Sequence, residues 1–546
     1  MADLDLRKVA FPTLDDIQVA TLAKFGTRRV LRDGEHLFKA GDREYKFFVV
    51  ERGAVEIVEH SSGETKRVAW HDRHAFGGDV SLVTGRPALV SAIARGDTEV
   101  FEISPSDIRR IMSERPALGE LLLRAFIARR EVLVASGFQG LRVLGAGSSR
   151  DTFRIRDFLA RNQVPFTWID VDHDPQVGAL LHSFGLTEAD TPVVVFGSEP
   201  LLRNPSTRAL ADLIGVRRPL TQRVYDLVIV GGGPAGLAAA VYASSEGLAA
   251  AVIDATAPGG QAGTSSKIEN YLGFPTGISG AELANRAILQ AQKFGAQFSS
   301  PSQVARVEFE NDQAVVWLDD GGHVSTRCVL IATGAEYRKL DVPQREQFEG
   351  LGVYYAATPT ELQLCRGADV IVVGGGNSAG QAVMFLSEST KRVFLLLRGG
   401  GLRKSMSSYL ADRIESADNI EVLPEAEICR MLGDQWLEAV EIKDLRTGET
   451  RTVQTPAVFT FIGAIPCTSW LPAEIETDPK GFVKTGPLVS ASPYWTADRE
   501  PFFLETSRPG VFAAGDVRLG STKRVASAVG EGAMAVQFVH EYLRVK

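Results

Sequence analysis

Hydrophobic and polar positions alternate in three different ways along the chain, and each way predicts a different kind of fold. Residues 30–110 contain short runs rich in β-branched and aromatic residues, separated by glycine turns at about ten-residue spacing. This pattern predicts a small β-barrel or jelly-roll domain. The segment ALGELLLRAFIARREVL follows, with apolar residues three and four positions apart, which predicts a helix after the barrel.

Residues 141–216 switch to an alternation of strands and helices. Strands are expected at 141–147, 165–172 and 191–197, and helices at 150–163, 176–185 and 206–216. This order resembles the thioredoxin or glutaredoxin fold, and Thr191-Pro192 matches the position of that fold's cis-proline. The redox dithiol of that fold should lie between the first strand and the first helix, where this chain reads GSSRDT. The resemblance therefore concerns the fold and not the chemistry.

From Tyr225 onward the pattern is strand, glycine loop and helix, and it occurs twice. The first loop is Gly231-x-Gly233-x-x-Gly236, and Asp254 ends the next expected strand. The glycines permit a tight turn, a close approach to a pyrophosphate and close packing of helix on strand, and the acid can accept from a ribose hydroxyl. The predicted dinucleotide contacts here are Gly231, Gly233, Pro234, Ala235, Gly236 and Asp254.

The second loop is Gly374-x-Gly376-x-x-Ala379, and the strand after it ends in an arginine instead of an acid. An arginine at that position favours a ribose 2′-phosphate, and hence NADPH over NADH. The alternative interpretation is a solvated basic turn. The predicted NADPH contacts are Gly374, Gly376, Asn377, Ser378, Arg398 and Arg403.

Two further stretches fit an FAD domain that is interrupted by the NADPH domain. Ala332 lies at a strand end in CVLIATGAEYR, where the chain would cross between domains. Near the carboxyl end a strand leads into Gly515-Asp516, and a helix follows from about Val525. Asp516 can accept from the flavin's ribityl hydroxyls, and the positive helix end can face the flavin edge that gains negative charge on reduction.

Over residues 225–546 these motifs resemble the low-molecular-weight thioredoxin reductases. The resemblance implies FAD contacts for Gly260 and Gln261 in PGGQAG, for Asn270 in IENYLGFP, and for Arg524 and Val525 in the final motif. It also implies a homodimer.

The redox cysteine pair of that family aligns with the segment from Ala356 to Pro359, which reads Ala-Ala-Thr-Pro. Both sulfurs are absent, and Cys365 is alone. The usual relay from flavin through a protein disulfide is therefore broken, no side chain is predicted to be catalytic, and the flavin would carry the chemistry.

The stretch FGGDVSLVTGRPALVSA resembles the phosphate-binding cassette of cyclic-nucleotide-binding domains. The resemblance implies that Arg86 pairs with a cyclic phosphate, Asp79 binds the ribose 2′-hydroxyl and Gly78 allows close approach. Asp79 replaces the family's glutamate, and Pro87 replaces a Ser/Thr and offers neither hydroxyl nor N–H. We expect weak binding of cyclic AMP or cyclic GMP, with a nucleotide-free dimerisation or docking barrel as the alternative.

Length, charge and cysteine content exclude several other classes of protein. A chain of 546 residues suggests three or four domains, and a formal net charge of −8 argues against binding of nucleic acid or of anionic membranes. The four cysteines contain no CxxC pair, and the eight histidines form no metal-ligand spacing, which favours a metal-free protein of the reducing cytoplasm. The uncharged run 227–245 contains GGGPAG, so we expect no membrane span.

The sequence therefore predicts a multidomain chain with a β-barrel, a thioredoxin-like α/β domain and two Rossmann-like dinucleotide domains. The expected boundaries are 1–138, 139–222, 223–340 with 464–546 for FAD, and 341–463 for NADPH. The expected activity is transfer of electrons from NADPH through FAD to an unidentified acceptor. The alternatives are a ferredoxin or flavodoxin reductase, a reductase of external thioredoxin, and a flavin-based redox sensor or adaptor without turnover.

Overall fold

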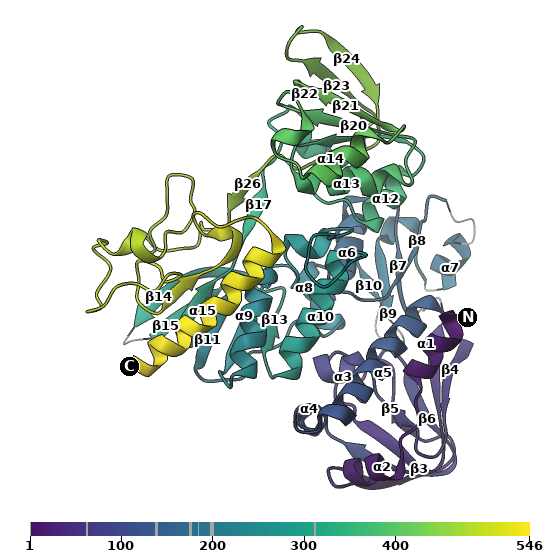
Figure 1. The fold of residues 1–546 in the computed structure, drawn as a ribbon. Helices are drawn as coiled ribbons and strands as arrows, with labels where there is room; N and C mark the ends of the chain where they lie inside the picture. Colours follow the sequence, from purple (N-terminus) through teal and green to yellow (C-terminus); the bar gives the residue numbers. More distant parts are fainter. Residues whose placement is uncertain are drawn as a thin grey trace. The chain divides into compact units, whose positions relative to one another are not determined.

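The computed structural model divides the chain into two compact units, which are described separately (Figure 1). It describes residues 2–61, 64–136, 140–173, 177–183, 185–196, 201–310 and 313–545. The first unit comprises Met1–Ala146, Val164–Arg218 and Leu289–Gln297, and the second comprises Gly147–Gln163, Pro219–Ile288 and Phe298–Lys546.

The amino-terminal part of the first unit is an antiparallel β-structure, as its alternating pattern predicts. Its strands run in the order β1-β6-β3-β4, with β2 paired to β6 and β5 paired to β3. Their bounds are β1 Thr27–Leu31, β2 His36–Phe38, β3 Phe47–Ser61, β4 Glu64–His71, β5 Phe76–Gly77 and β6 Ser91–Ile103. The helices are α1 Ala2–Ala10, α2 Asp16–Ala23, α3 Val80–Thr84, α4 Pro105–Glu114 and α5 Pro116–Ala135. Phe47, Phe76 and Phe126 form the aromatic centre of its core.

The first unit also holds a four-stranded sheet in the order β10-β9-β7-β8. β7 pairs parallel with β8 and antiparallel with β9. The bounds are β7 Leu141–Leu144, β8 Thr167–Ile169, β9 Val193–Phe196 and β10 Leu202–Arg203, with α7 Val177–Ser183 and α8 Thr207–Leu213. The Thr191-Pro192 peptide bond is cis, as the sequence predicts. Outside the described residues lie the predicted boundary at 138–139 and three predicted element positions, namely 176, 184 and 197.

In the second unit, the first glycine loop belongs to a seven-stranded sheet in the order β13-β12-β11-β16-β15-β14, with β27 paired to β16. β11, β12, β16 and β27 are parallel, so their carboxyl ends share one edge. The strands are β11 Tyr225–Val230, β12 Ala250–Ile253, β13 Gln297–Ser299, β14 Val304–Glu310, β15 Gln313–Leu318, β16 His323–Ile331 and β27 Val511–Ala513. The helices are α9 Pro234–Ser245, α10 Gly280–Lys293 and α15 Val525–Val545, and the part of α10 from Leu289 onward is counted with the first unit.

The second glycine loop belongs to a parallel sheet in the order β18-β25-β19-β20-β21, next to a three-stranded sheet β22-β23-β24. The strands are β18 Val353–Tyr354, β19 Asp369–Val373, β20 Arg392–Leu397, β21 Ile420–Pro424, β22 Ala426–Leu432, β23 Ala439–Asp444, β24 Thr450–Gln454 and β25 Val458–Thr460. The helices are α11 Arg345–Phe348, α12 Pro359–Cys365, α13 Asn377–Ser387 and α14 Ser408–Glu415.

The chain enters and leaves this region through a short antiparallel pair, β17 Ala335–Tyr337 with β26 Ala464–Pro466. One α/β region is thus inserted into the other, as the sequence predicts. The residue boundaries given for these domains stay predictions.

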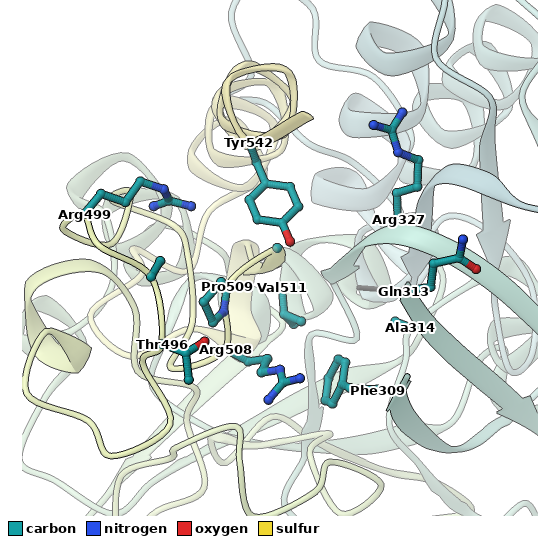
Figure 2. A pocket seen from close by; sticks show the side chains of 12 residues that line it. Phe309, Gln313, Ala314, Arg327, Thr496, Arg499, Arg508, Pro509, Val511 and Tyr542 are labelled. Carbon is teal, nitrogen blue, oxygen red and sulfur yellow. The ribbon is translucent and has the colours of Figure 1, made fainter. Parts of the chain in front are cut away.

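The second unit also has a pocket at the edge where β16 and β27 begin, opposite the edge that carries the glycine loops. It has a volume of about 290 Å³, and Figure 2 shows Arg327, Arg499 and Arg508 among the side chains that line it. Each of these arginines has a carboxylate partner: Asp226 for Arg327, Glu505 for Arg499 and Glu474 for Arg508. The positive charge of the pocket wall is therefore balanced from within the unit.

We predict that the Arg499–Glu505 pair stabilises this end of the sheet. Glu505 is fully buried and accepts from both terminal nitrogens of Arg499, at 2.7 and 2.8 Å, and from the backbone N–H of Gly510 at 2.9 Å. Glu505→Gln should lower the free energy of unfolding by about 3 kcal/mol, the low end for breaking a buried ion pair, because Arg499 keeps some solvent contact. Urea unfolding measures this effect, with exposed Glu500→Gln as the control. An equal, small effect of both variants would contradict it.

Candidate functional site

The first glycine loop is shaped by two contacts that leave no room for a side chain. Gly231 has a φ of 107°, and a Cβ on it would lie 2.3 Å from the carbonyl oxygen of Ala332. A Cβ on Gly236 would lie 1.9 Å from the carbonyl oxygen of Gly231. At Gly233, in contrast, the Cα of Gly260 is the only atom of the described residues within 4 Å of a Cβ position. The space above Gly233 is therefore open.

The helix behind this loop presents unsatisfied backbone donors to that open space. α9 begins at Pro234, and no side chain among the described residues caps it at Gly233. The first N–H groups of a helix have no partner inside the helix and carry its positive dipole end. An anionic group such as a pyrophosphate fits this position.

Asp254 follows β12 and holds the loop in place. Its Oδ2 accepts from the N–H of Gly232 at 2.8 Å, and its Oδ1 accepts from the N–H of Thr256 at 2.9 Å. Burial raises the pKa of Asp254, while these backbone hydrogen bonds oppose the shift. The sequence did not indicate this positioning role, and the predicted contact of Asp254 with a ribose hydroxyl stays a prediction.

The carboxyl-terminal motif meets the first loop although 280 positions separate Ala235 from Gly515. A Cβ on Gly515, whose φ is 77°, would lie 3.0 Å from the Cβ of Ala235. A Cβ on Gly532 would lie 2.1 Å from the carbonyl oxygen of Ala235, so α15 packs closely on α9. Burial raises the pKa of Asp516, which the charge of Lys523 opposes. α15 begins at Val525, directly after Arg524, so the predicted helix start is confirmed.

The remaining residues predicted to contact FAD differ in their placement. Gly260 has a φ of 57° and packs against Gly233, with a Cβ position 2.9 Å from the Cα of Gly233. Gln261 donates its side-chain amide to the carbonyl oxygen of Ala335. Asn270 is exposed, and no described contact joins it to the other candidates. The structure therefore brings together all of these residues except Asn270.

The second loop repeats the geometry of the first. Gly374 has a φ of 144°, and its Cβ position lies 2.5 Å from the carbonyl oxygen of Phe461. Nothing lies within 4 Å of a Cβ position on Gly376 in the described part of the chain. Asn377 begins α13 and accepts from the N–H of Ser407 at 2.7 Å. The second loop is therefore also tight at its first glycine and open at its second.

Tyr337 lies between the two loops, and the sequence interpretation missed it. Burial raises the pKa of its hydroxyl, and a hydrogen bond with Ser378 of the second loop opposes the shift. The charge of Asp516, from the carboxyl-terminal motif, raises the pKa further. The only sequence signal was the position of Tyr337 in the segment that crosses between the two regions.

The two arginines expected to hold a 2′-phosphate lie in different surroundings. Arg398 follows β20, is exposed and has no hydrogen-bond or ion-pair partner among the described residues. Arg403 donates to Asp412 and Glu415 of α14, each at 2.6 Å, and these carboxylates raise its pKa. Arg398 is therefore available to a phosphate, whereas Arg403 would first have to leave two carboxylates.

The position of the missing cysteine pair has become the start of a helix. Thr358 caps α12 and donates to Glu361, whose Oε2 also accepts from the N–H of Thr358 at 2.8 Å. Pro359 occupies the first helical position, where its missing N–H has no consequence. Ala356 is buried. This stretch holds no redox-active side chain.

Cys365 does not replace the missing pair. It is buried at the end of α12, its Sγ donates to the carbonyl oxygen of Glu361 at 3.4 Å, and burial raises its pKa to about 12. A thiol rather than a thiolate is therefore present at neutral pH, and the thiolate is the reactive form. None of the four cysteines forms a disulfide bond.

Helix α6, Arg150–Arg161, covers the outer side of this region within the second unit. Arg156 is buried and donates to the side chain of Gln363 on α12 at 2.9 Å. The Phe153 ring lies 5.6 Å from the ring of Tyr354. The helix that begins within the segment GSSRDT therefore packs against α12 and the Tyr354 ring, on either side of the segment Ala356–Pro359 in sequence.

In the first unit, the structure places Gly78, Asp79 and Arg86 around α3. Gly78 has a φ of 139°. Asp79 caps α3 and accepts from the Tyr45 hydroxyl at 2.7 Å and from the hydroxyl of Ser81 at 3.2 Å. Arg86 is half-buried, and burial lowers its pKa to about 9.

The cavity beside this cassette has a volume of about 60 Å³ and is lined by Tyr45, Asp79, Arg129 and Arg130, among others. Pockets that hold drug-sized ligands have volumes of about 300 Å³ or more. A cyclic nucleotide could therefore enter only if the cavity opened, and Asp79 would have to exchange its present partners for the ribose.

Two kinds of feature are not found in the part of the chain that the structure describes. No group of three or more His, Cys, Asp or Glu side chains could hold a metal ion there. None of the helices there is long and apolar enough to cross a membrane.

We predict that Glu361 makes stability depend on pH. Burial raises its pKa from the ordinary value of 4.5 to about 7, so the folded protein keeps a proton that the unfolded chain loses near pH 4.5. Stability should therefore fall between about pH 4.5 and 7 and be level above. The difference between the two pKa values corresponds to about 3 kcal/mol.

Glu361→Gln removes this titration. Relative to the natural protein, the variant should be more stable by up to about 3 kcal/mol at pH 8, with the difference vanishing near pH 5. Urea unfolding at both pH values measures it, with exposed Glu346→Gln as the control. The same difference at pH 5 and pH 8 would contradict the prediction.

Comparison with known proteins agrees with this geometry. The model of the pyridine nucleotide-disulphide oxidoreductase family matches residues 225–532, and that of the cyclic nucleotide-binding domain matches residues 28–115. A thioredoxin reductase of Treponema pallidum (strain Nichols) is 36% identical over 326 residues, which are 58% of this chain and 97% of the relative.

Two solved structures share the fold of the second half. The thioredoxin reductase of Lactococcus lactis aligns with a TM-score of 0.53 and 28% identity, over 59% of this chain and 100% of that one. The thioredoxin reductase of T. acidophilum aligns with a TM-score of 0.53 and 30% identity, over 59% of this chain and 99% of that one. The chain thus belongs, through residues 225–532, to the pyridine nucleotide-disulphide oxidoreductase family, and it carries a cyclic nucleotide-binding domain before them.

Proposed function

We propose that this protein is an NADPH-dependent FAD oxidoreductase that passes electrons from NADPH through FAD to an acceptor other than a disulfide of its own. The observation that carries the proposal is the pair of loops at Gly231 and Gly374, each closed at its first glycine and open at its second. Bound FAD would supply hydride acceptance and electron transfer. The chain's own residues bind and orient the two nucleotides.

On the FAD side, the N–H groups at the start of α9 would hold the pyrophosphate over Gly233. Asp516 would accept from ribityl hydroxyls, and the amino end of α15 would face the edge of the flavin where negative charge grows. Asp254 keeps the loop in shape through Gly232. The same functions on the NADPH side fall to α13 and to Arg398.

The acceptor is proposed to lie outside the chain, because α12 carries no cysteine pair and Cys365 is a buried thiol. An external ferredoxin or flavodoxin is the first alternative. Reduction of an external thioredoxin disulfide is a weaker one, because α6 covers the α12 region. A flavin-based sensor that is reduced but does not turn over is the non-enzymatic alternative.

Four further features belong to this proposal. The sheet order β10-β9-β7-β8 and the cis Thr191-Pro192 bond support a thioredoxin-like middle domain without a dithiol. We also propose a homodimer, by analogy with the thioredoxin reductase family, and a cytoplasmic location, because none of the four cysteines forms a disulfide bond. The amino-terminal domain is proposed to bind cyclic AMP or cyclic GMP weakly, since Asp79 is engaged by Tyr45.

We predict that the purified protein binds about one FAD per chain and takes up two electrons per FAD in an anaerobic dithionite titration. Residues 356 and 359 offer no sulfur, so no thiolate-to-flavin charge-transfer band should form. Uptake of four electrons would reveal a redox disulfide and contradict the assignment. Reduction by NADPH followed by a panel of acceptors separates an enzyme, which reoxidises rapidly with one of them, from a sensor.

We predict that Arg398 selects NADPH over NADH. A charge-assisted hydrogen bond to phosphate contributes about 1.5–3 kcal/mol, so Arg398→Ala should weaken NADPH about tenfold or more and leave NADH unchanged. Arg392→Ala, at the opposite end of β20, is the matched control. Steady-state kinetics with both nucleotides measures the ratio, and an unchanged ratio in Arg398→Ala would refute the role.

A further inference from the structure

The tip of the phosphate-binding cassette is in contact with the end of the segment Val164–Arg218 of the same unit. A Cβ on Gly85 would lie 1.7 Å from a terminal guanidinium nitrogen of Arg218, and a Cβ on Gly215 would lie 2.5 Å from Cδ of Pro87. Arg43 also donates to the backbone carbonyl of Asp212. The segment from Asp212 to Arg218 therefore lies directly on the cassette, and glycines at both contacts make this approach possible.

The contact brings several positive charges together. Burial, together with the charges of Arg130 and Arg218, lowers the pKa of Arg86 to about 9, against the opposing charge of Asp79. Burial also lowers the pKa of Arg218, and the charges of Arg109 and Arg43 add to the shift. Asp79 is the only carboxylate among these influences.

Among the charges that shift the pKa values of Arg86 and Arg218, positive charge thus exceeds negative charge. Asp79 is shared among the N-cap of α3, the Tyr45 hydroxyl and Ser81, so it does not neutralise the cluster alone. No hydrogen bond or ion pair is found for Arg218 in the part of the first unit that the structure describes. Partly buried like charges are unfavourable unless an anion compensates them.

The position of Arg218 matches a deficiency in the cassette. Pro87 offers neither an N–H nor a hydroxyl to a bound phosphate. The guanidinium of Arg218 lies against Gly85, two positions earlier, and a guanidinium presents several N–H donors in a geometry that suits phosphate oxygens. One additional guanidinium can therefore replace the two neutral donors that the sequence lacks.

We propose that Arg86 of the cassette and Arg218 of the following segment together form a two-guanidinium site for the phosphate of a bound ligand. The proposal rests on the proposed cyclic-nucleotide binding and deepens it by naming a second phosphate-binding residue outside the cassette. Arg218 ends the segment Val164–Arg218 of the first unit, and Pro219 begins the next segment, which belongs to the second unit. A phosphate held by Arg218 therefore fixes the point at which the chain passes from the nucleotide-binding domain toward the reductase.

The test is calorimetry of the full-length holoprotein with cyclic AMP, cyclic GMP and inorganic phosphate. We expect Arg218→Ala to weaken the bound nucleotide about tenfold or more, Arg218→Lys to recover part of the loss, and Arg217→Ala, next to it in the same segment, to bind as the natural protein does. FAD content and reduction by NADPH should be unchanged in all three variants, which verifies folding. Hydrogen exchange of residues 212–218 should slow on binding in the natural protein and not in Arg218→Ala.

The outcomes separate this proposal from the one on which it rests. If Arg86→Ala abolishes binding and Arg218→Ala leaves it unchanged, the cassette binds nucleotide and the role of Arg218 is refuted. If the natural protein binds neither cyclic nucleotide, cyclic-nucleotide binding is refuted. The role of Arg218 is then tested by the effect of inorganic phosphate on thermal stability. Thermal stabilisation by phosphate over chloride at equal ionic strength, lost in Arg218→Ala and kept in Arg217→Ala, supports the site; no stabilisation, or equal stabilisation of all variants, overturns it.

Discussion

The close approach of one backbone segment to another at two glycines is the constraint on which the reductase half depends. Gly231 lies against the carbonyl of Ala332, and Gly374 lies against the carbonyl of Phe461. In both places β-strands that are distant in sequence end at the same sheet edge, and the loop must turn there without a side chain. Because the turn is so tight, the next helix begins directly at the edge, and its free N–H groups point into the space above the second glycine. The open space in front of each helix start is thus a consequence of backbone packing.

The fold does not need a cysteine pair at the position where the related family carries one, because the residues found there form a helix start. In this chain the segment from Ala356 to Pro359 serves to start a helix: Thr358 caps it, Glu361 completes the capping box and Pro359 takes the first helical position. Buried Cys365 and buried Arg156 then fit around α12 as packing groups. What remains is a surface on which α6 packs, and in the proposed function the electrons leave the flavin by another route.

The sequence predicted the structural features that follow from local patterns, and it missed the contacts that depend on which residues the tertiary fold brings together. Both glycine loops, the interrupted order of the two α/β regions and the antiparallel barrel follow from periodicity and from glycine positions, and the structure has them. The bond from Asp254 to the N–H of Gly232 and the pairing of Arg403 with two α14 carboxylates were not predictable, because each depends on which partner the fold brings near. Asn270 was predicted to contact FAD from a family motif, but it is exposed in the structure. A motif indicates which residue type stands at a position and does not determine the contacts of that residue.

The amino-terminal domain shows how a departure from a motif can be compensated from outside it. Within the cassette alone, Pro87 offers no N–H or hydroxyl donor to a phosphate, and Asp79 has a side chain one methylene shorter than the glutamate of the family pattern. In the folded unit Asp79 becomes a helix cap held by Tyr45, and Arg218 arrives beside Gly85 from a segment more than a hundred residues away in sequence. In the proposed site, one guanidinium belongs to the cassette and the other to the segment that follows the domain in sequence, so the site is complete only when that segment is in place. Anything that moves the connecting segment changes the site, and by linkage any ligand in the site biases the connecting segment.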